Sequence, residues 1–155
     1  MKILIFSDTH GDWKKMSDAL RKHPDAEILV HCGDGERQSE EMAFKYRDKM
    51  TVRVCGNCDL GSMLHTEEIF TVNGKKIMVT HGHFYDVKFG LGALRRAAAE
   101  KGVDIVFFGH THIPVNEYSD GIYLFNPGHC SGWHATYGVA EIPESGHPLL
   151  SHAKI

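Results

Sequence analysis

The chain has 155 residues, a length typical of one globular domain. Hydrophobic residues make up 42% and charged residues 24%, which excludes a disordered or collagen-like chain. The formal net charge is −3 without a block of basic residues, so nucleic acid is not expected to be the main partner. Histidine is unusually frequent, with 12 copies, and a functional interpretation has to explain them.

No apolar stretch approaches the ~20 residues of a membrane-spanning helix, and the run Ile3–Phe6 is too short for a secretory signal. We therefore expect a cytoplasmic protein without a membrane partner. In that compartment cysteines remain reduced thiols. The four cysteines are Cys32, Cys55, Cys58 and Cys130.

The first third of the chain predicts a β-α-β-α-β unit. Its strands are short apolar runs, typical of parallel strands that are buried on both faces. Its first helix carries Trp13, Met16 and Leu20 at helical spacing and ends before Pro24. The predicted elements are Ile3–Phe6, Asp12–His23, Ile28–Val30, Glu36–Tyr46 and Thr51–Cys55.

The rest of the chain predicts a hairpin, a third helix and a further set of strands. Asn73-Gly74 is a two-residue hairpin turn, and Gly102 is a helix stop. The fold class is therefore α/β (α+β), with two mixed β-sheets flanked by helices in a single domain over residues 1–155. The remaining elements are Glu68–Val72, Lys76–Thr80, Lys88–Lys101, Ile105–Phe108, Val115–Tyr118, Ile122–Phe125, Thr136–Ile142 and Leu149–Ala153.

Polar side chains gather where the predicted strands end. Ligands of α/β proteins bind at the carboxyl ends of strands, and glycine lets several turns approach one point. Carboxylate, amide and imidazole groups suit divalent transition metals, and pairs of such ions recur in phosphatases and nucleases. The strand-end segments are Asp8-Thr9-His10, His31-Cys32-Gly33-Asp34, Gly56-Asn57-Cys58-Asp59, His81-Gly82-His83 and Gly109-His110-Thr111-His112.

In this order the segments resemble the motifs of the calcineurin-like metallophosphoesterases, and more closely those of their small YfcE-like phosphodiesterase branch. Asn126-Pro127-Gly128 falls where that branch has a late turn. The resemblance implies a four-layer αββα sandwich with two divalent metal ions, Mn²⁺ in the first place and Ni²⁺, Fe²⁺ or Zn²⁺ as alternatives. By resemblance, one ion is held by Asp8, His10 and His112, the other by Asn57, His81 and His110, and Asp34 bridges them.

The resemblance further implies a metal-dependent phosphoesterase, in the first place a phosphodiesterase, in which a metal-bridging hydroxide attacks a small phosphate ester. A homo-oligomer is left open. The alternative is a non-catalytic protein-interaction scaffold of the same fold, like the retromer subunit of this family. A scaffold is free to lose metal ligands, yet all seven implied ligands are present here, which favours the enzyme.

The third motif departs from the wider family, where a histidine is thought to protonate the leaving group. Here that residue is Cys58, and a thiol with a pKa near ~8.5 is a poorer acid than imidazolium at neutral pH. We assign tentative catalytic roles to Asn57 and His83 and tentative substrate contacts to His83, Cys58 and His129. The alternative for His83 is a hydrogen bond to a ligand or a solvated side chain. After the late turn this chain departs from the branch, because it has a loop with Trp133 and His134. The resemblance therefore does not identify the substrate.

The other histidines and basic residues have structural interpretations. His31 ends an apolar strand and is expected to be buried with its hydrogen bonds satisfied. Cys55-Gly56-Asn57-Cys58 lacks the second cysteine pair of a zinc site, and Cys55 is expected to be a small core residue. Arg95-Arg96 is expected to lie on a solvated face. The histidines expected to be exposed are His23, His65, His147 and His152.

Overall fold

A computed structural model describes residues 1–155 as two five-stranded sheets with helices outside them. The first sheet has the order β10-β9-β1-β2-β3. Its strands β1, β2 and β3 are parallel, whereas β9 and β10 run antiparallel. The strands of this sheet are β1 (Lys2–Phe6), β2 (Ile28–His31), β3 (Met50–Arg53), β9 (Thr136–Glu141) and β10 (Leu149–Lys154).

The second sheet has the order β4-β5-β6-β8-β7. Its three central strands β5, β6 and β8 are parallel, and the edge strands β4 and β7 are antiparallel to their neighbours. Both sheets are therefore mixed. The strands are β4 (Glu67–Val72), β5 (Lys75–Thr80), β6 (Ile105–Phe107), β7 (Val115–Ser119) and β8 (Ile122–Asn126).

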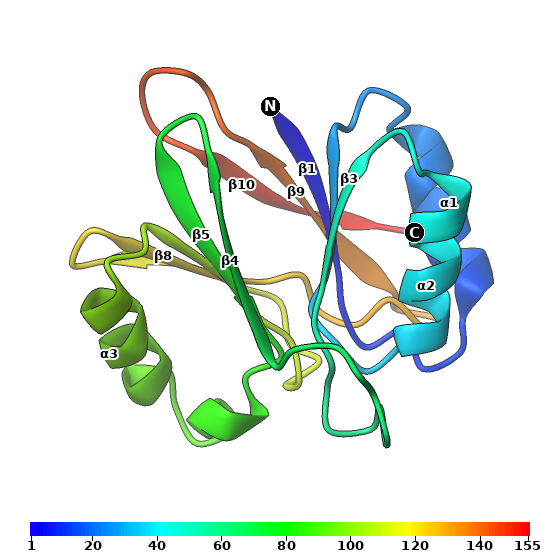
Figure 1. Ribbon diagram of the computed structural model, residues 1–155, viewed down its shortest axis with the longest axis horizontal. Helices are drawn as coiled ribbons and strands as arrows, with labels where there is room; N and C mark the ends of the chain where they lie inside the picture. Colours follow the sequence, from blue (N-terminus) through cyan, green and yellow to red (C-terminus); the bar gives the residue numbers. More distant parts are fainter.

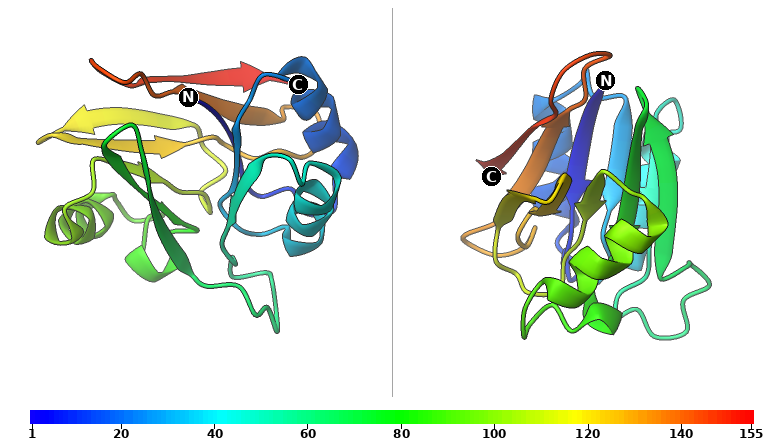
Figure 2. Two further views of the ribbon diagram at one scale, coloured as in Figure 1. Left: turned by 45° about the horizontal axis from the view of Figure 1, so that its top comes forward. Right: turned by 90° about the vertical axis from the view of Figure 1, so that its left-hand side faces the viewer.

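Three α-helices cover the outer faces of the sheets, α1 (Trp13–Lys22), α2 (Glu36–Lys45) and α3 (Gly92–Lys101). In Figure 1, α1 and α2 lie on one side of the two sheets and α3 on the other. The same arrangement is visible from two other directions in Figure 2. The four layers confirm the predicted αββα sandwich.

Burial on both faces explains why β1 is apolar at every position. Ile3 and Ile5 belong to the core between the sheets, together with residues of the second sheet such as Phe107. Leu4 and Phe6 point the other way, into a cluster that includes residues of α1 and α2. A strand buried in this way leaves polar side chains only at its ends, where the turns begin.

Two predicted boundaries are wrong. The predicted strand Thr51–Cys55 is β3 at Met50–Arg53, because the Cys55 N–H donates to the His65 carbonyl instead of continuing the pairing with β2. The helix predicted from Lys88 begins only at Gly92. The preceding chain forms a short 3₁₀ helix (His83–Tyr85) and turns through positive φ at Asp86 and Gly90, which an α-helix excludes.

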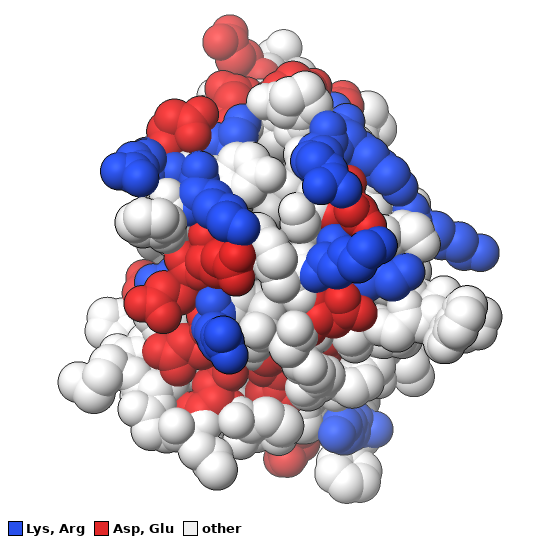
Figure 3. Space-filling model, turned by 90° about the vertical axis from the view of Figure 1, so that its right-hand side faces the viewer, with Lys and Arg blue, Asp and Glu red and all other residues white.

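Charges on the side of α1 and α2 are of both signs. Figure 3 shows Lys and Arg interspersed with Asp and Glu on this face. Ion pairs within the helices, such as Lys14–Asp18 and Lys45–Glu41, account for part of this pattern. Of the pair Arg95-Arg96, Arg96 is exposed as predicted, whereas Arg95 is half-buried and its guanidinium donates to the Ser119 carbonyl and to Glu117. None of the helices is long and apolar enough to cross a membrane.

Of the four histidines expected to be exposed, two bind neighbouring groups. His23 is half-buried, and its Nε2 lies 2.9 Å from the Tyr137 hydroxyl. His152 is exposed as a residue, yet its Nε2 lies 2.7 Å from the Asn126 carbonyl and its ring stacks on Phe125. His65 and His147 are exposed as predicted. The prediction failed for His23 because its partner Tyr137 is 114 residues away in the sequence.

His31 is buried with both ring nitrogens in hydrogen bonds, as predicted. The Gly33 N–H donates to Nδ1 at 3.2 Å, so Nε2 carries the ring proton and donates to Thr9 Oγ1 at 3.1 Å. Burial lowers the pKa of His31 from 6.5 to about 4. The neutral ring is therefore part of the folded state.

The His31 pKa predicts a pH dependence of stability. Between pH 6.5 and pH 4 the unfolded chain binds a proton at this site and the folded chain does not, so stability falls as the pH falls. The loss is about 1.4 kcal/mol per pH unit. Urea unfolding in chelator should show a smaller loss in His31→Gln than in wild type or in the exposed control His147→Gln, because the His31 share of the slope is removed while other histidines with lowered pKa values, such as His110, keep theirs. The same pH slope in His31→Gln as in wild type would contradict the assignment.

Candidate metal centre

The five polar turns meet at one edge of the molecule. They follow β1, β2, β3, β5 and β6, and the loops after the first four lie at the lower edge of Figure 1. Backbone hydrogen bonds join them: Asp8 N–H donates to the Gly33 carbonyl, His10 N–H to the Asp34 carbonyl, and Gly109 N–H to the His81 carbonyl. The side chains of these turns are therefore held in a shared, fixed arrangement.

The backbone of these turns is unusual. The structure has eight non-glycine residues with positive φ, and five of them are among the seven predicted ligands. Such conformations are costly for residues with a Cβ and are concentrated at functional sites. The five residues, with their φ angles, are Asp8 (52°), His10 (41°), Asp34 (56°), His110 (69°) and His112 (61°).

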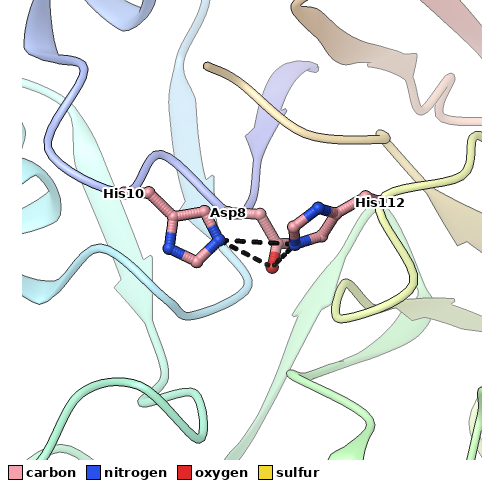
Figure 4. A group of neighbouring side chains, drawn as sticks. All are labelled: Asp8, His10 and His112. Atoms are coloured by element: carbon pink, nitrogen blue, oxygen red, sulfur yellow. Dashed lines mark hydrogen bonds and ion pairs between the residues drawn. The ribbon is translucent and has the colours of Figure 1, made fainter. Parts of the chain in front are cut away.

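Asp8, His10 and His112 form the first group of converging donor atoms (Figure 4). Asp8 Oδ1 lies 3.1 Å from His112 Nε2 and 3.8 Å from His10 Nε2, and the two imidazole nitrogens are 3.3 Å apart. Asp8 Oδ1 is buried and has no hydrogen-bond partner. A buried oxygen of this kind is costly unless a proton or a cation pairs with it.

The other carboxylate oxygen of Asp8 is fully paired. Oδ2 accepts a hydrogen bond from Ser7 Oγ at 2.6 Å and another from the His110 backbone N–H at 3.1 Å. These two donors fix the orientation of the carboxylate and direct Oδ1 at the histidines. Held in this way, Asp8 fits the role of a metal ligand supported by its neighbours.

Asp34, His81 and Asn57 form the second group, which also lies beside Asp8. His81 Nδ1 lies 2.8 Å from the Cys32 carbonyl, which makes this nitrogen the donor. His81 Nε2 then faces only oxygens, Asn57 Oδ1 at 3.1 Å and Asp34 Oδ2 at 3.4 Å. Without an ion, a proton on Nε2 pairs with the Asp34 carboxylate. If a cation takes the place of that proton, Nε2 and the two oxygens offer it three acceptors, and Asp8, Asp34 and His81 all offer ligand atoms within 4.8 Å of one another.

The pKa values of the second group reflect the contacts between its side chains. Burial alone would raise the pKa of Asp34, but hydrogen bonds from His81 and Cys58 outweigh it and hold the pKa well below its usual value. Burial lowers the pKa of His81, yet the Asp34 and Asp8 carboxylates raise it overall. His110, whose ring lies 5.0 Å from that of His81, has its pKa lowered to about 4 by burial, His81 and Lys88, which leaves its ring neutral. The donor atoms of five predicted ligands, Asp8, His10, Asp34, His81 and His112, thus converge as divalent ions require.

Sequence reasoning missed Asp59, which holds the turn of Asp34 in place. Its carboxylate accepts backbone hydrogen bonds from Asp34 (2.8 Å), Gly35 (3.0 Å), Glu36 (2.9 Å) and Gly56 (2.8 Å). Asp59 thereby joins the turn after β3 to the first residues of α2. The sequence signal was its place in Gly56-Asn57-Cys58-Asp59, but only the fold shows which N–H groups it pairs.

Two glycines allow the turns to approach this closely. A Cβ on Gly56 would overlap Asp34 Oδ1, and a Cβ on Gly109 would overlap Ser7 Oγ. Both clashes would be with groups that position a predicted ligand. The glycines are therefore needed for space and not for an unusual φ angle, since neither has one.

The predicted catalytic and substrate residues also lie at this edge. The ring of His83 lies 5.4 Å from that of His81, and its buried Nδ1 has no hydrogen-bond partner. His129 Nδ1 lies 3.2 Å from the His112 carbonyl. Cys58 offers its sulfur within 4.8 Å of donor atoms on His10 and Asp34. Trp133, by contrast, is 96% exposed.

A polar pocket of about 310 Å³ opens beside the centre and is lined in part by His10, Asp34, Cys58 and Arg37. A larger pocket of about 400 Å³, lined by Met1, Lys2 and others, lies at the opposite end of β1 and contains none of the predicted ligands. Converging donor atoms, and not pocket volume, therefore locate the site.

Comparison with known proteins identifies the family of the chain. Residues 1–145 match the model of the calcineurin-like phosphoesterase superfamily domain. The chain belongs to that superfamily. It is 34% identical over 129 residues to a probable metallophosphoesterase, YsnB of Bacillus subtilis, covering 83% of this chain and 74% of the relative. It is 30% identical over 149 residues to the phosphodiesterase MJ0936 of Methanocaldococcus jannaschii, covering 86% of each.

Among solved structures, a predicted phosphoesterase from Streptococcus pneumoniae is similar, with a TM-score of 0.84 and 25% identity, covering 99% of this chain and 88% of that one. The family resemblance expected from the sequence is therefore confirmed.

Removing the Asp59 carboxylate tests its role. In Asp59→Ala four backbone N–H groups lose a charged acceptor, so the free energy of unfolding in chelator should fall by about 2–4 kcal/mol. Urea denaturation measures the change. Asp48→Ala, at an exposed aspartate, is the control and should unfold like wild type. Equal stability of the two variants would show that Asp59 does not hold the turn.

Proposed function

We propose that this protein is a metal-dependent phosphodiesterase with a dinuclear centre. One divalent ion is assigned to Asp8, His10 and His112, and the other to Asn57, His81 and His110. Asp34 is assigned as the bridging ligand, because its carboxylate lies within 4.8 Å of donor atoms on both His10 and His81. The observation that carries the proposal is the unpartnered, buried Oδ1 of Asp8, which faces two imidazole nitrogens. That the relative MJ0936 is named a phosphodiesterase supports the reaction class.

When bound, two divalent ions supply a water nucleophile at neutral pH and stabilise charge on the phosphoryl oxygens. The chain's own residues would position the ester against this centre. Asn57, His83 and His129 surround it, and we assign Asn57 and His83 to orienting the reacting phosphate. His129 and Cys58 are assigned to contacts with the rest of the substrate.

The proposal also names the metal ion, the substrate and the compartment. Mn²⁺ is the first choice of ion, and a small phosphate ester in the cytoplasm is the substrate. The polar pocket beside His10 and Asp34 gives such an ester a route to the centre, and its lining holds the cation Arg37 together with the carboxylates of Glu36 and Asp59. Bound divalent ions, and not the lining, would supply the positive charge that attracts an anionic phosphate.

Metal dependence is the first test. Purified protein should bind manganese and hydrolyse an activated aryl phosphodiester, and Asp34→Ala should lower the rate at least about 100-fold, the scale of loss when one group stabilising developing charge is removed. Metal analysis and a colorimetric assay measure both, with Asp48→Ala as the active control. If wild type neither binds a transition metal nor hydrolyses the ester with added manganese, the interaction-scaffold alternative is correct.

The second test concerns the leaving group. Cys58 occupies the place of the proton-donating histidine in the wider family, so leaving groups that need protonation should react slowly. General acid catalysis contributes about 10²–10⁴-fold, and an alkyl phosphodiester should be slower than an aryl one by at least about that lower bound. The measurement compares the steady-state rates at which manganese-loaded enzyme hydrolyses matched aryl and alkyl diesters. Equal rates would mean that another group supplies the proton.

A further inference from the structure

The thiol of Cys58 lies within reach of two predicted metal ligands. Donor atoms of His10, Asp34 and Cys58 all lie within 4.8 Å of one another. His10 and Asp34 are assigned above to the dinuclear centre, whereas Cys58 is not among the seven implied ligands. This group adds a sulfur atom to a site otherwise made of nitrogen and oxygen donors.

The backbone fixes residue 58 beside the Asp34 carboxylate. The Cys58 N–H donates to Asp34 Oδ1 at 2.8 Å, and Asn57 Nδ2 lies 3.4 Å from Cys58 Sγ. The side chain itself is exposed, so Sγ is free to turn about one bond toward an ion. A cation held by His10 and Asp34 is therefore within reach of the sulfur without movement of the chain.

The same group lines the polar pocket that opens beside the centre. Cys58 thus lies on the path by which solvent, and on the proposed function a phosphate ester, reaches His10 and Asp34. An ion bound by all three residues would occupy part of that path.

We propose that Cys58 Sγ, with His10 and Asp34, binds thiophilic divalent cations such as Zn²⁺ and Cd²⁺. Thiolate sulfur is a soft ligand that favours these ions over Mn²⁺, and coordination releases the thiol proton to solvent. This inference rests on the dinuclear centre of the proposed function and adds a metal selectivity to it. Hard ions use the nitrogen and oxygen donors, whereas a soft ion also takes the sulfur and closes the pocket to substrate.

Cys55 provides an internal control, because it is three residues away and its sulfur has another role. Its Sγ donates a hydrogen bond to the Leu64 carbonyl at 3.3 Å, and the residue is half-buried. It belongs to none of the groups of converging donor atoms. Cys32 and Cys130 are buried and take no part in the pocket.

The experiment is a titration of the metal-free protein with Cd²⁺ and, separately, with Mn²⁺. Cadmium bound to thiolate has an ultraviolet charge-transfer band, which wild type and Cys55→Ser should show and Cys58→Ser should lose. Calorimetry should find Cd²⁺ affinity at least about tenfold weaker in Cys58→Ser, the scale of loss for a group that supports a metal site. Serine keeps a hard oxygen at the same place, so Mn²⁺ affinity should be nearly unchanged.

A cadmium band that persists in Cys58→Ser, or bound cadmium without a band in wild type, would overturn the assignment. The proposed function is tested separately, by measuring manganese-supported hydrolysis of an aryl diester by the same wild-type protein. A cadmium band that depends on Cys58 in a protein without hydrolysis would support the sulfur ligand and reject the phosphodiesterase.

Discussion

The central constraint in this protein is a buried carboxylate of which only one oxygen is paired. Ser7 and the His110 backbone hold Asp8 Oδ2, and Oδ1 is left against His10 and His112 without a hydrogen-bond donor. Burying such an oxygen costs several kcal/mol unless a positive charge pairs with it. The fold accepts this cost at the point where two sheets bring five turns together, and a bound cation would offset it.

Other residues of the site hold the turns around Asp8 in place. Asp59 holds the backbone of the Asp34 turn, and the absence of side chains at Gly56 and Gly109 lets neighbouring turns approach. Left-handed backbone at Asp8, Asp34 and His110 points these side chains at a common centre. Since each of these conformations costs free energy, the core between the sheets has to compensate, and it supplies rigid strands from which the turns emerge.

Much of this could be predicted from the sequence, because apolar strands that end in polar turns follow a local pattern. Ile3–Phe6 predicted β1 and the position of Asp8 directly. The fold also showed what local pattern does not encode. The partner of His23 is Tyr137, and the contact of Arg95 is on β7. Three of the four N–H groups held by Asp59 come from a different turn and from the start of α2. The start of α3 was predicted too early because the backbone at Asp86 and Gly90 is set by the fold around the site and not by helix periodicity.

The account depends on two cations sharing Asp34, and anomalous X-ray diffraction from crystals grown with manganese tests this most directly. The predicted result is two manganese peaks per chain, one among Asp8, His10 and His112 and one among Asn57, His81 and His110, both in contact with Asp34. A fully loaded crystal with no peak at these residues, or with a peak elsewhere only, would contradict the account.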